Sequence, residues 1–266
     1  MEINREVNKP NASFDAIAKL LAIDPAMTAR VLKIVNSPFY GLSRKVENIR
    51  HALTLLGLKT FQRVVLTAAL HDVLIGSDKE HQEELSLFWN YTMVVAKITE
   101  YLVVRSPMFV DLVTPEQAHL AGLFHDCAVP LFVRKYPGYQ EHMAKVKADN
   151  LQVFAYEEDN FSANHWAMGA LMARSWFVPE SVCQAIRFHH LSKLDSSHVS
   201  EMEALEILPL FELLRLGDLL GGNLMNEKGF EVTGCYSSEE EFLANINLDQ
   251  AELEELKQEV RDAVQL

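Results

Sequence analysis

Apolar residues recur every three or four positions along most of this chain, and this spacing is the feature that most restricts its fold. Such a repeat lines one face of an α-helix with apolar side chains. It predicts helices over residues 14–23, 25–36, 46–56, 60–75, 88–104, 114–133, 137–148, 162–176, 179–190, 203–220 and 248–266. No alternating run is long enough for a sheet, so we predict an all-α helical bundle.

The boundaries of these helices are marked by residues with known positional preferences. Asp24-Pro25 is typical of a helix start, with Asp as the cap and Pro at the first helical position. Thr114–Gln117 has the pattern of a capping box. Gly57 and Gly221-Gly222 are typical helix stops, and Pro130 is expected to end or kink its helix.

Composition and length favour one globular unit. The chain has 266 residues, of which 49% are hydrophobic and 23% are charged, so it is not largely disordered. No linker rich in Pro, Gly or Ser divides it. We therefore predict a single unit with an N-terminal helical lobe (1–80), a helical core (81–222) and an acidic C-terminal tail with a helix (223–266).

Charge is distributed unevenly along the chain. The net charge of −13 argues against nonspecific nucleic-acid binding by the whole surface. The stretch 25–66 is locally basic, and it is either a docking face for an acidic partner or a solvated face that pairs with the acidic tail. We favour the second interpretation. The docking alternative would use Arg30, Lys33, Arg44 and Lys45.

Three widely spaced cysteines, Cys127, Cys183 and Cys235, form no CxxC pair. This pattern supports neither a disulfide framework nor a zinc ribbon. The N-terminus lacks a secretory signal, and no run approaches 18 apolar residues. We expect a cytoplasmic protein that does not span a membrane.

Several histidines and aspartates lie on helix faces that otherwise look buried. Imidazole and carboxylate together suit Mn, Fe or Zn, and helical bundles build such sites from facing helices. The alternative is that these residues make unrelated hydrogen bonds in the core. The residues are His125, Asp126, His165, His189, His190 and Asp218.

One long motif resembles a known family. The segment Asp24–Ser37, DPAMTARVLKIVNS, with Phe39–Leu42 and Leu55–Gly57 after it, is similar to the HDOD branch of the HD superfamily of metal-dependent phosphohydrolases. The resemblance covers about residues 12–220. It implies an HD-like helical bundle with an additional N-terminal lobe.

The resemblance also implies roles for particular residues. His125-Asp126 matches the HD doublet and Asp218 the last acid of the signature, which leaves His71-Asp72 as a chance pair. His165, His189 and His190 match the extra histidines of the related HD-GYP branch, which degrades cyclic di-GMP with two or three metals.

This chain departs from the pattern at three places. The first metal histidine falls at Tyr91, which is a poor ligand for this class. Cys127-Ala128 follows the doublet without the lysine of the HDxGK pattern, and Leu191–Lys193 shows no GYP motif. Loss of a direct ligand should weaken a metal site by more than the roughly 10- to 100-fold typical of outer-sphere changes.

Three hypotheses follow. We favour a noncatalytic, bacterial-type signal-transduction output module that binds a protein or a small ligand. The first alternative is a metal-dependent phosphohydrolase acting on a nucleotide or cyclic dinucleotide, with Asp126 at its centre. The second alternative is a nucleic-acid-binding regulator that uses the basic N-terminal lobe.

Overall fold

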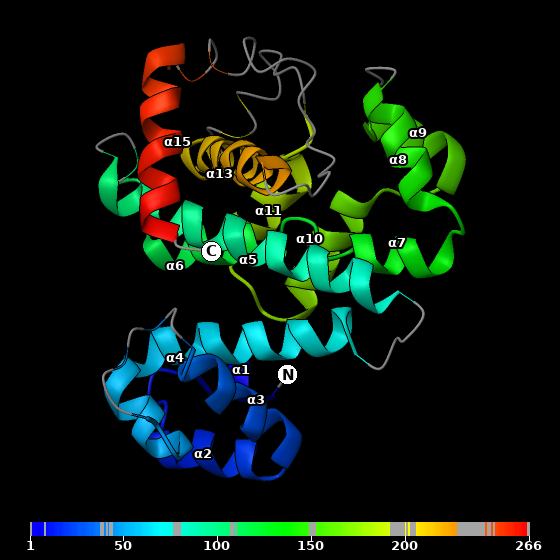
Figure 1. Cartoon of the computed structure of the whole chain (residues 1–266). Helices are drawn as coiled ribbons and strands as arrows, with labels where there is room; N and C mark the ends of the chain where they lie inside the picture. Colours follow the sequence, from blue (N-terminus) through cyan, green and yellow to red (C-terminus); the bar gives the residue numbers. More distant parts are fainter. Residues whose placement is uncertain are drawn as a thin grey trace. The chain divides into compact units, whose positions relative to one another are not determined.

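The computed structural model describes most of the chain as helices (Figure 1), and no strand occurs among the residues that it describes. These residues are 2–7, 9–37, 40, 42, 45–76, 81–106, 109, 111–148, 153–191, 200, 202, 206–227, 243, 246 and 248–264. The all-α prediction is confirmed. The chain divides into two compact units, Met1–Ser77 and Asp78–Leu266.

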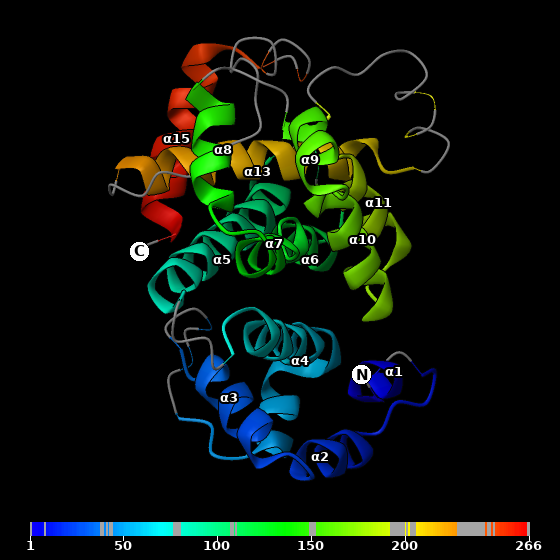
Figure 2. The same cartoon turned by 90° about the vertical axis from the view of Figure 1, so that its right-hand side faces the viewer.

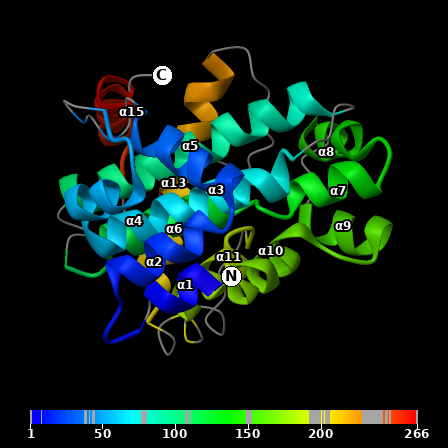
Figure 3. The same cartoon turned by 90° about the horizontal axis from the view of Figure 1, so that it is seen from below.

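The first unit is built around one long element, α4 (Ile49–Leu74), against which α1 (Glu2–Val7), α2 (Phe14–Ala22) and α3 (Pro25–Val35) pack (Figures 2 and 3). The predicted cap is present, because Asp24 accepts a hydrogen bond from the Met27 amide at 3.0 Å. The core of this unit is formed by Ile17, Leu21, Val31, Val35, Leu53 and Phe61.

Gly57 interrupts α4 as the sequence predicted. Its φ of 72° and ψ of 170° lie in a region that is essentially restricted to glycine. By length and composition alone α4 is apolar enough to cross a membrane, but 56% of its most apolar stretch is buried inside the protein.

Polar contacts close the loop between α3 and α4. The Asn36 side chain donates to the carbonyls of Leu32 and Val46, each at 2.8 Å, and accepts from the Val46 amide at 2.7 Å. Arg30 forms an ion pair with Asp72, which ties α3 to the end of α4.

The second unit has a core of three helices. Here α5 (Gln82–Arg105) packs against α6 (Pro115–Phe124) and α13 (Leu208–Glu227). The remaining described helices of this unit are α7 (Val129–Lys135), α8 (Tyr139–Ala148), α9 (Val153–Phe161), α10 (His165–Ser175), α11 (Glu180–Phe188) and α15 (Gln250–Val264). The element α11 packs against α6, α10 and α13.

The C-terminal helix packs on its own unit, as its amphipathic pattern indicated. Leu253, Val260 and Val264 of α15 are buried, and α15 contacts α5 and α13. Arg105 of α5 donates to Glu259 at 3.2 Å, which adds a polar contact to this interface.

Several predicted helix boundaries were wrong. Pro130 lies in the first turn of α7 instead of ending the preceding helix, because a proline fits the first turn of a helix, where its missing amide is not needed. Helix α13 continues through Gly221-Gly222 to Glu227, so these glycines are not a stop. Helices α1 and α9 were not predicted.

The contact between α5 and α6 requires a glycine at position 122. A Cβ added there would lie 2.7 Å from the Ala96 Cα and 2.8 Å from the Thr99 Oγ1. Thr99 itself donates to the Ala118 carbonyl of α6 at 2.8 Å. The backbones of the two helices are therefore in direct contact at this point. This contact fixes the position of α6, the helix that leads into the His125-Asp126 doublet.

We predict that Gly122→Ala destabilises the protein by about 1–3 kcal/mol, because the backbone of α5 cannot move aside cheaply. Gly222→Ala in α13 is the matched control, since nothing lies within 4 Å of its added Cβ. The control should be neutral or stabilising by up to about 1 kcal/mol. Urea unfolding midpoints of both variants measure the difference, and equal midpoints would refute the close-packing argument.

Candidate metal centre

The His125-Asp126 doublet lies where α6 ends. Helix α6 finishes at Phe124, and residues 125–128 form a turn before α7 begins. His125 Nδ1 binds the Gly122 carbonyl at 2.7 Å, and the Asp126 carbonyl accepts from the Val129 amide at 2.9 Å. The turn is therefore held at both ends, and the doublet side chains have fixed positions.

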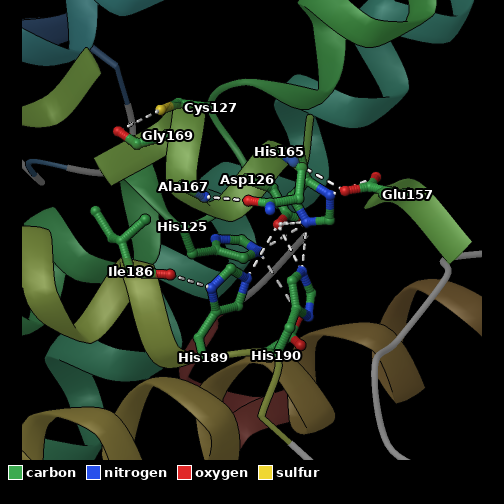
Figure 4. A network of polar contacts seen from close by, with 12 residues as sticks. His125, Asp126, Cys127, Glu157, His165, Ala167, Gly169, Ile186, His189 and His190 are labelled. Carbon is green, nitrogen blue, oxygen red and sulfur yellow. Dashed lines mark hydrogen bonds and ion pairs between the residues drawn. The ribbon is translucent and has the colours of Figure 1, made fainter. Parts of the chain in front are cut away.

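Three imidazoles, one at the start of α10 and two directly after α11, surround the Asp126 carboxylate (Figure 4). Asp126 Oδ1 lies 3.2 Å from His189 Nε2, 3.3 Å from His165 Nε2 and 3.6 Å from His190 Nε2. The candidate ligand atoms of these four residues all lie within 4.8 Å of one another. We call Asp126, His165, His189 and His190 the imidazole cluster.

In His189 and His165 the Nδ1 atom, which is the outer ring nitrogen, points away from Asp126. Its hydrogen bond determines whether the Nε2 atom, which faces Asp126, can act as a metal ligand. His189 Nδ1 binds the Ile186 carbonyl at 2.6 Å, and His165 Nδ1 binds Glu157 Oε1 at 2.7 Å. Carbonyl and carboxylate oxygens only accept, so each Nδ1 carries the proton and donates it. The Nε2 of each neutral ring then offers a lone pair toward Asp126, which is also an acceptor.

Acceptors facing acceptors require a proton or a metal cation between them. Ligating histidines in proteins usually donate their outer N–H to a carbonyl or carboxylate, which is the arrangement seen at His165 and His189. The cluster therefore fits a divalent cation by the chemistry of its donor set.

The pKa values of the buried histidines depend strongly on the neighbouring carboxylates and imidazoles. Burial lowers the pKa of His165, but Glu157 and Asp126 together raise it to about 10. Burial likewise lowers the pKa of His125, whereas Asp126 and Asp218 raise it to about 9. Burial and the neighbouring His189 and His165 hold the pKa of His190 well below its ordinary value. Without metal, protons on His125 and His165 balance the carboxylates.

The other predicted donors lie beside the imidazole cluster. Asp126 Oδ2 is 3.4 Å from His125 Nε2, which in turn is 3.7 Å from Asp218 Oδ1. The Tyr91 hydroxyl donates to Asp218 Oδ1, and its ring meets the His125 ring edge-on at 5.7 Å. The structure thus brings all six predicted donors and Tyr91 into one polar region.

Glu157 is a site residue that the sequence analysis missed. It is completely buried in α9, where Oε2 accepts from the His165 amide at 2.8 Å and the Tyr139 hydroxyl donates to Oε1. The available signal was an acid with Phe154 three positions before it and Phe161 four positions after it. That spacing places Glu157 on the apolar face of a helix.

Cys127 follows Asp126 directly but takes no part in the cluster. Its thiol donates to the Gly169 carbonyl at 3.7 Å, on a different side of the turn from the Asp126 carboxylate (Figure 4). Burial, the largest effect, and the Asp126 charge both raise the pKa of this thiol. Cys127 is therefore a protonated core residue rather than a ligand or nucleophile.

The predicted basic docking residues all belong to the first unit. Arg30 is paired with Asp72, whereas Lys33 and Lys45 are exposed. Arg44 lies outside the described residues. The docking face stays a prediction.

Comparison with known proteins identifies the family. The family model of the HDOD domain matches residues 1–192. The chain belongs to the HDOD family. A curated relative of this HDOD chain, an uncharacterized protein of Treponema pallidum (strain Nichols), is 25% identical over 198 residues, or 71% of the chain. The chain spans 36% of the length of that relative.

Solved structures share the HDOD fold over 98% of this chain. A Shewanella amazonensis SB2B protein named "Putative phosphohydrolase" is 23% identical, with a TM-score of 0.69 over 87% of its own chain. An HDOD domain protein with unknown function from Geobacter sulfurreducens is 21% identical, with a TM-score of 0.64 over 90% of its chain. A Marinobacter aquaeolei VT8 protein named "Putative signal transduction protein" is 18% identical, with a TM-score of 0.64 over 56% of its chain.

We predict that Cys127 and Cys183 resist thiol reagents near neutral pH. Both are buried, and burial together with Glu180 raises the pKa of Cys183 to about 11, so neither forms the reactive thiolate. In a Cys235→Ser background, Ellman's reagent should label no thiol in the native protein and two after unfolding. Rapid native labelling would contradict this burial.

Proposed function

We propose that this HDOD chain is a metal-dependent regulatory module of a signalling system, which acts by binding a protein or small ligand rather than by hydrolysis. The observation that carries the proposal is the convergence of three imidazole Nε2 atoms on Asp126, with the Nδ1 atoms of His165 and His189 already committed as donors. This arrangement needs a cation to be stable at a pH where the rings are neutral.

The imidazole cluster supplies three nitrogen donors and one carboxylate. This donor set suits a divalent ion such as Mn, Fe or Zn, and Asp126, His165, His189 and His190 would hold it. When bound, such an ion supplies Lewis-acid polarisation of a bound oxygen atom. Glu157 fixes the ring orientation and tautomer of His165 from behind.

The cation would join parts of the second unit that are distant in sequence. Asp126 belongs to the turn after α6, His165 begins α10, and His189 and His190 follow α11. Binding of a metal would therefore stabilise the relative positions of these segments. In a regulatory module, metal binding would thereby change the positions of the segments that form the partner-binding surface.

Burial favours a noncatalytic role. The cluster histidines expose 4% or less of their side chains and Asp126 exposes 13%, so little of the site is open to a phosphate ester. A catalytic metal needs an accessible coordination position for water or substrate. Cys127, directly after the doublet, provides no positive charge for a phosphoryl group.

A phosphohydrolase is the second candidate, and one observation favours it. His125, Asp126 and Asp218 still adjoin one another in the order that the resemblance to the HD superfamily implies. The protein loaded with Mn²⁺ or Fe²⁺ should not hydrolyse cyclic di-GMP or a chromogenic phosphodiester. Turnover that Asp126→Asn abolishes would establish the hydrolase instead.

The proposal predicts bound metal in protein purified without chelators. Elemental analysis should find a divalent ion in the wild type and in Asp159→Asn, an exposed control in α9, but not in Asp126→Asn. Added metal at about 100 times its dissociation constant should stabilise the first two by about 2.7 kcal/mol. Absence of metal and of thermal stabilisation in the wild type would refute the proposal.

We further predict that Glu157→Gln weakens metal binding by about 10- to 100-fold while the protein stays folded. Glutamine has nearly the same shape but lacks the charge that orients and polarises His165. Competition with a chromophoric chelator measures the affinity, and Asp159→Asn is again the matched control. An unchanged affinity for Glu157→Gln would show that this carboxylate does not support the metal.

A further inference from the structure

The Asp126 carboxylate presents its two oxygens to two different groups of side chains. Oδ1 faces the imidazole cluster, whereas Oδ2 faces His125 Nε2 at 3.4 Å. His125 Nδ1 donates to the Gly122 carbonyl, so Nε2 is the nitrogen that can offer a lone pair to a cation once it has lost its proton. This nitrogen is completely buried and forms no hydrogen bond among the residues that the structure describes. It lies between two carboxylates, Asp126 and Asp218.

These atoms outline a second position for a cation, which would share Asp126 with the first. The donors available there are His125 Nε2, Asp126 Oδ2 and Asp218 Oδ1. A bridging carboxylate is a normal way for two metal ions to lie within a few ångströms of each other, at about 3.5–4 Å. The fourth side chain at this position is Tyr91.

Tyr91 uses the oxygen that a second cation would need. Its hydroxyl donates to Asp218 Oδ1, which is the atom that also faces His125 Nε2. The hydroxyl proton therefore points at Asp218 Oδ1. A neutral phenol adds no charge to the position, whereas an imidazole would add a lone pair.

The Tyr91 ring is held in place on two sides. It packs edge-on against His125, with ring centroids 5.7 Å apart, and is 4% exposed. A Cβ added at Gly221 of α13 would lie 3.7 Å from Tyr91 Cε2, an ordinary van der Waals distance, so α13 passes beside the ring. The buried ring directs its hydroxyl at Asp218.

We infer that Tyr91 closes the second cation position, so that this chain binds one divalent ion at the imidazole cluster and an imidazole at residue 91 would open the site to two. The inference rests on the proposed function, because the first ion must bind. Tyr91 is then the residue that determines how many metal ions each chain binds.

The test compares wild type, Tyr91→His and Tyr91→Phe after saturation with Mn²⁺ and removal of the excess. Elemental analysis should give one ion per chain for the wild type and two for Tyr91→His. Tyr91→Phe should keep one, because it removes the hydroxyl that binds Asp218 but adds no donor. In Tyr91→His, electron paramagnetic resonance should show the exchange-coupled signal of two Mn²⁺ ions that share a ligand, in place of an isolated-ion spectrum.

The double variant Tyr91→His/Asp218→Asn is the control for position and should return to one ion. Circular dichroism and thermal unfolding establish that each variant is folded. Wild type with one ion and folded Tyr91→His with one ion would overturn the inference while the proposed function stands. Wild type with two ions would also overturn it. Wild type with none would overturn both, which separates the two failures.

A ferric titration tests the opposite role for Tyr91. If the phenol loses its proton and becomes a ligand, Fe³⁺ should produce a visible phenolate-to-iron charge-transfer band in the wild type that is absent in Tyr91→Phe. Such a band would overturn the inference, and its absence in wild type that retains the first ion supports it.

Discussion

The structure of the second unit depends on a buried carboxylate that is surrounded by lone pairs. Asp126 lies among three imidazoles, two of which have their outer nitrogens committed to Glu157 and to the Ile186 carbonyl. A buried anion beside neutral acceptors is costly, so this arrangement persists only with protons or a metal ion inside it. Every other feature of the site serves to place these groups or to limit what they bind.

Close helix packing is what makes this placement possible. Gly122 lets α6 approach α5 at backbone distance, and three residues later the helix ends at His125-Asp126. Asp218 reaches the same region from α13, which packs against both α5 and α6. The site is therefore an extension of the core, and its burial follows from the packing that forms it. That burial would strengthen the binding of a cation and restrict the access of a substrate.

Tyr91 and Glu157 act on opposite sides of Asp126. Glu157 supports the imidazole cluster by orienting His165, whereas Tyr91 occupies Asp218 on the other side. The two halves share a carboxylate but differ in their donors, since one is rich in imidazole and the other contains a phenol. This asymmetry distinguishes a site suited to holding one ion from one suited to two-metal chemistry.

Local sequence patterns were enough to predict the helical class, the Gly57 break and the six candidate donors, because periodicity and side-chain chemistry are local properties. They predicted the end of a helix at Pro130 wrongly and missed Glu157, since its short helix carries too weak a pattern to be recognised alone. The folded arrangement was needed to see that Asp126 faces two groups of side chains and that Tyr91 binds Asp218. These contacts join residues far apart in the chain, and helix packing, which local spacing does not encode, sets their distances.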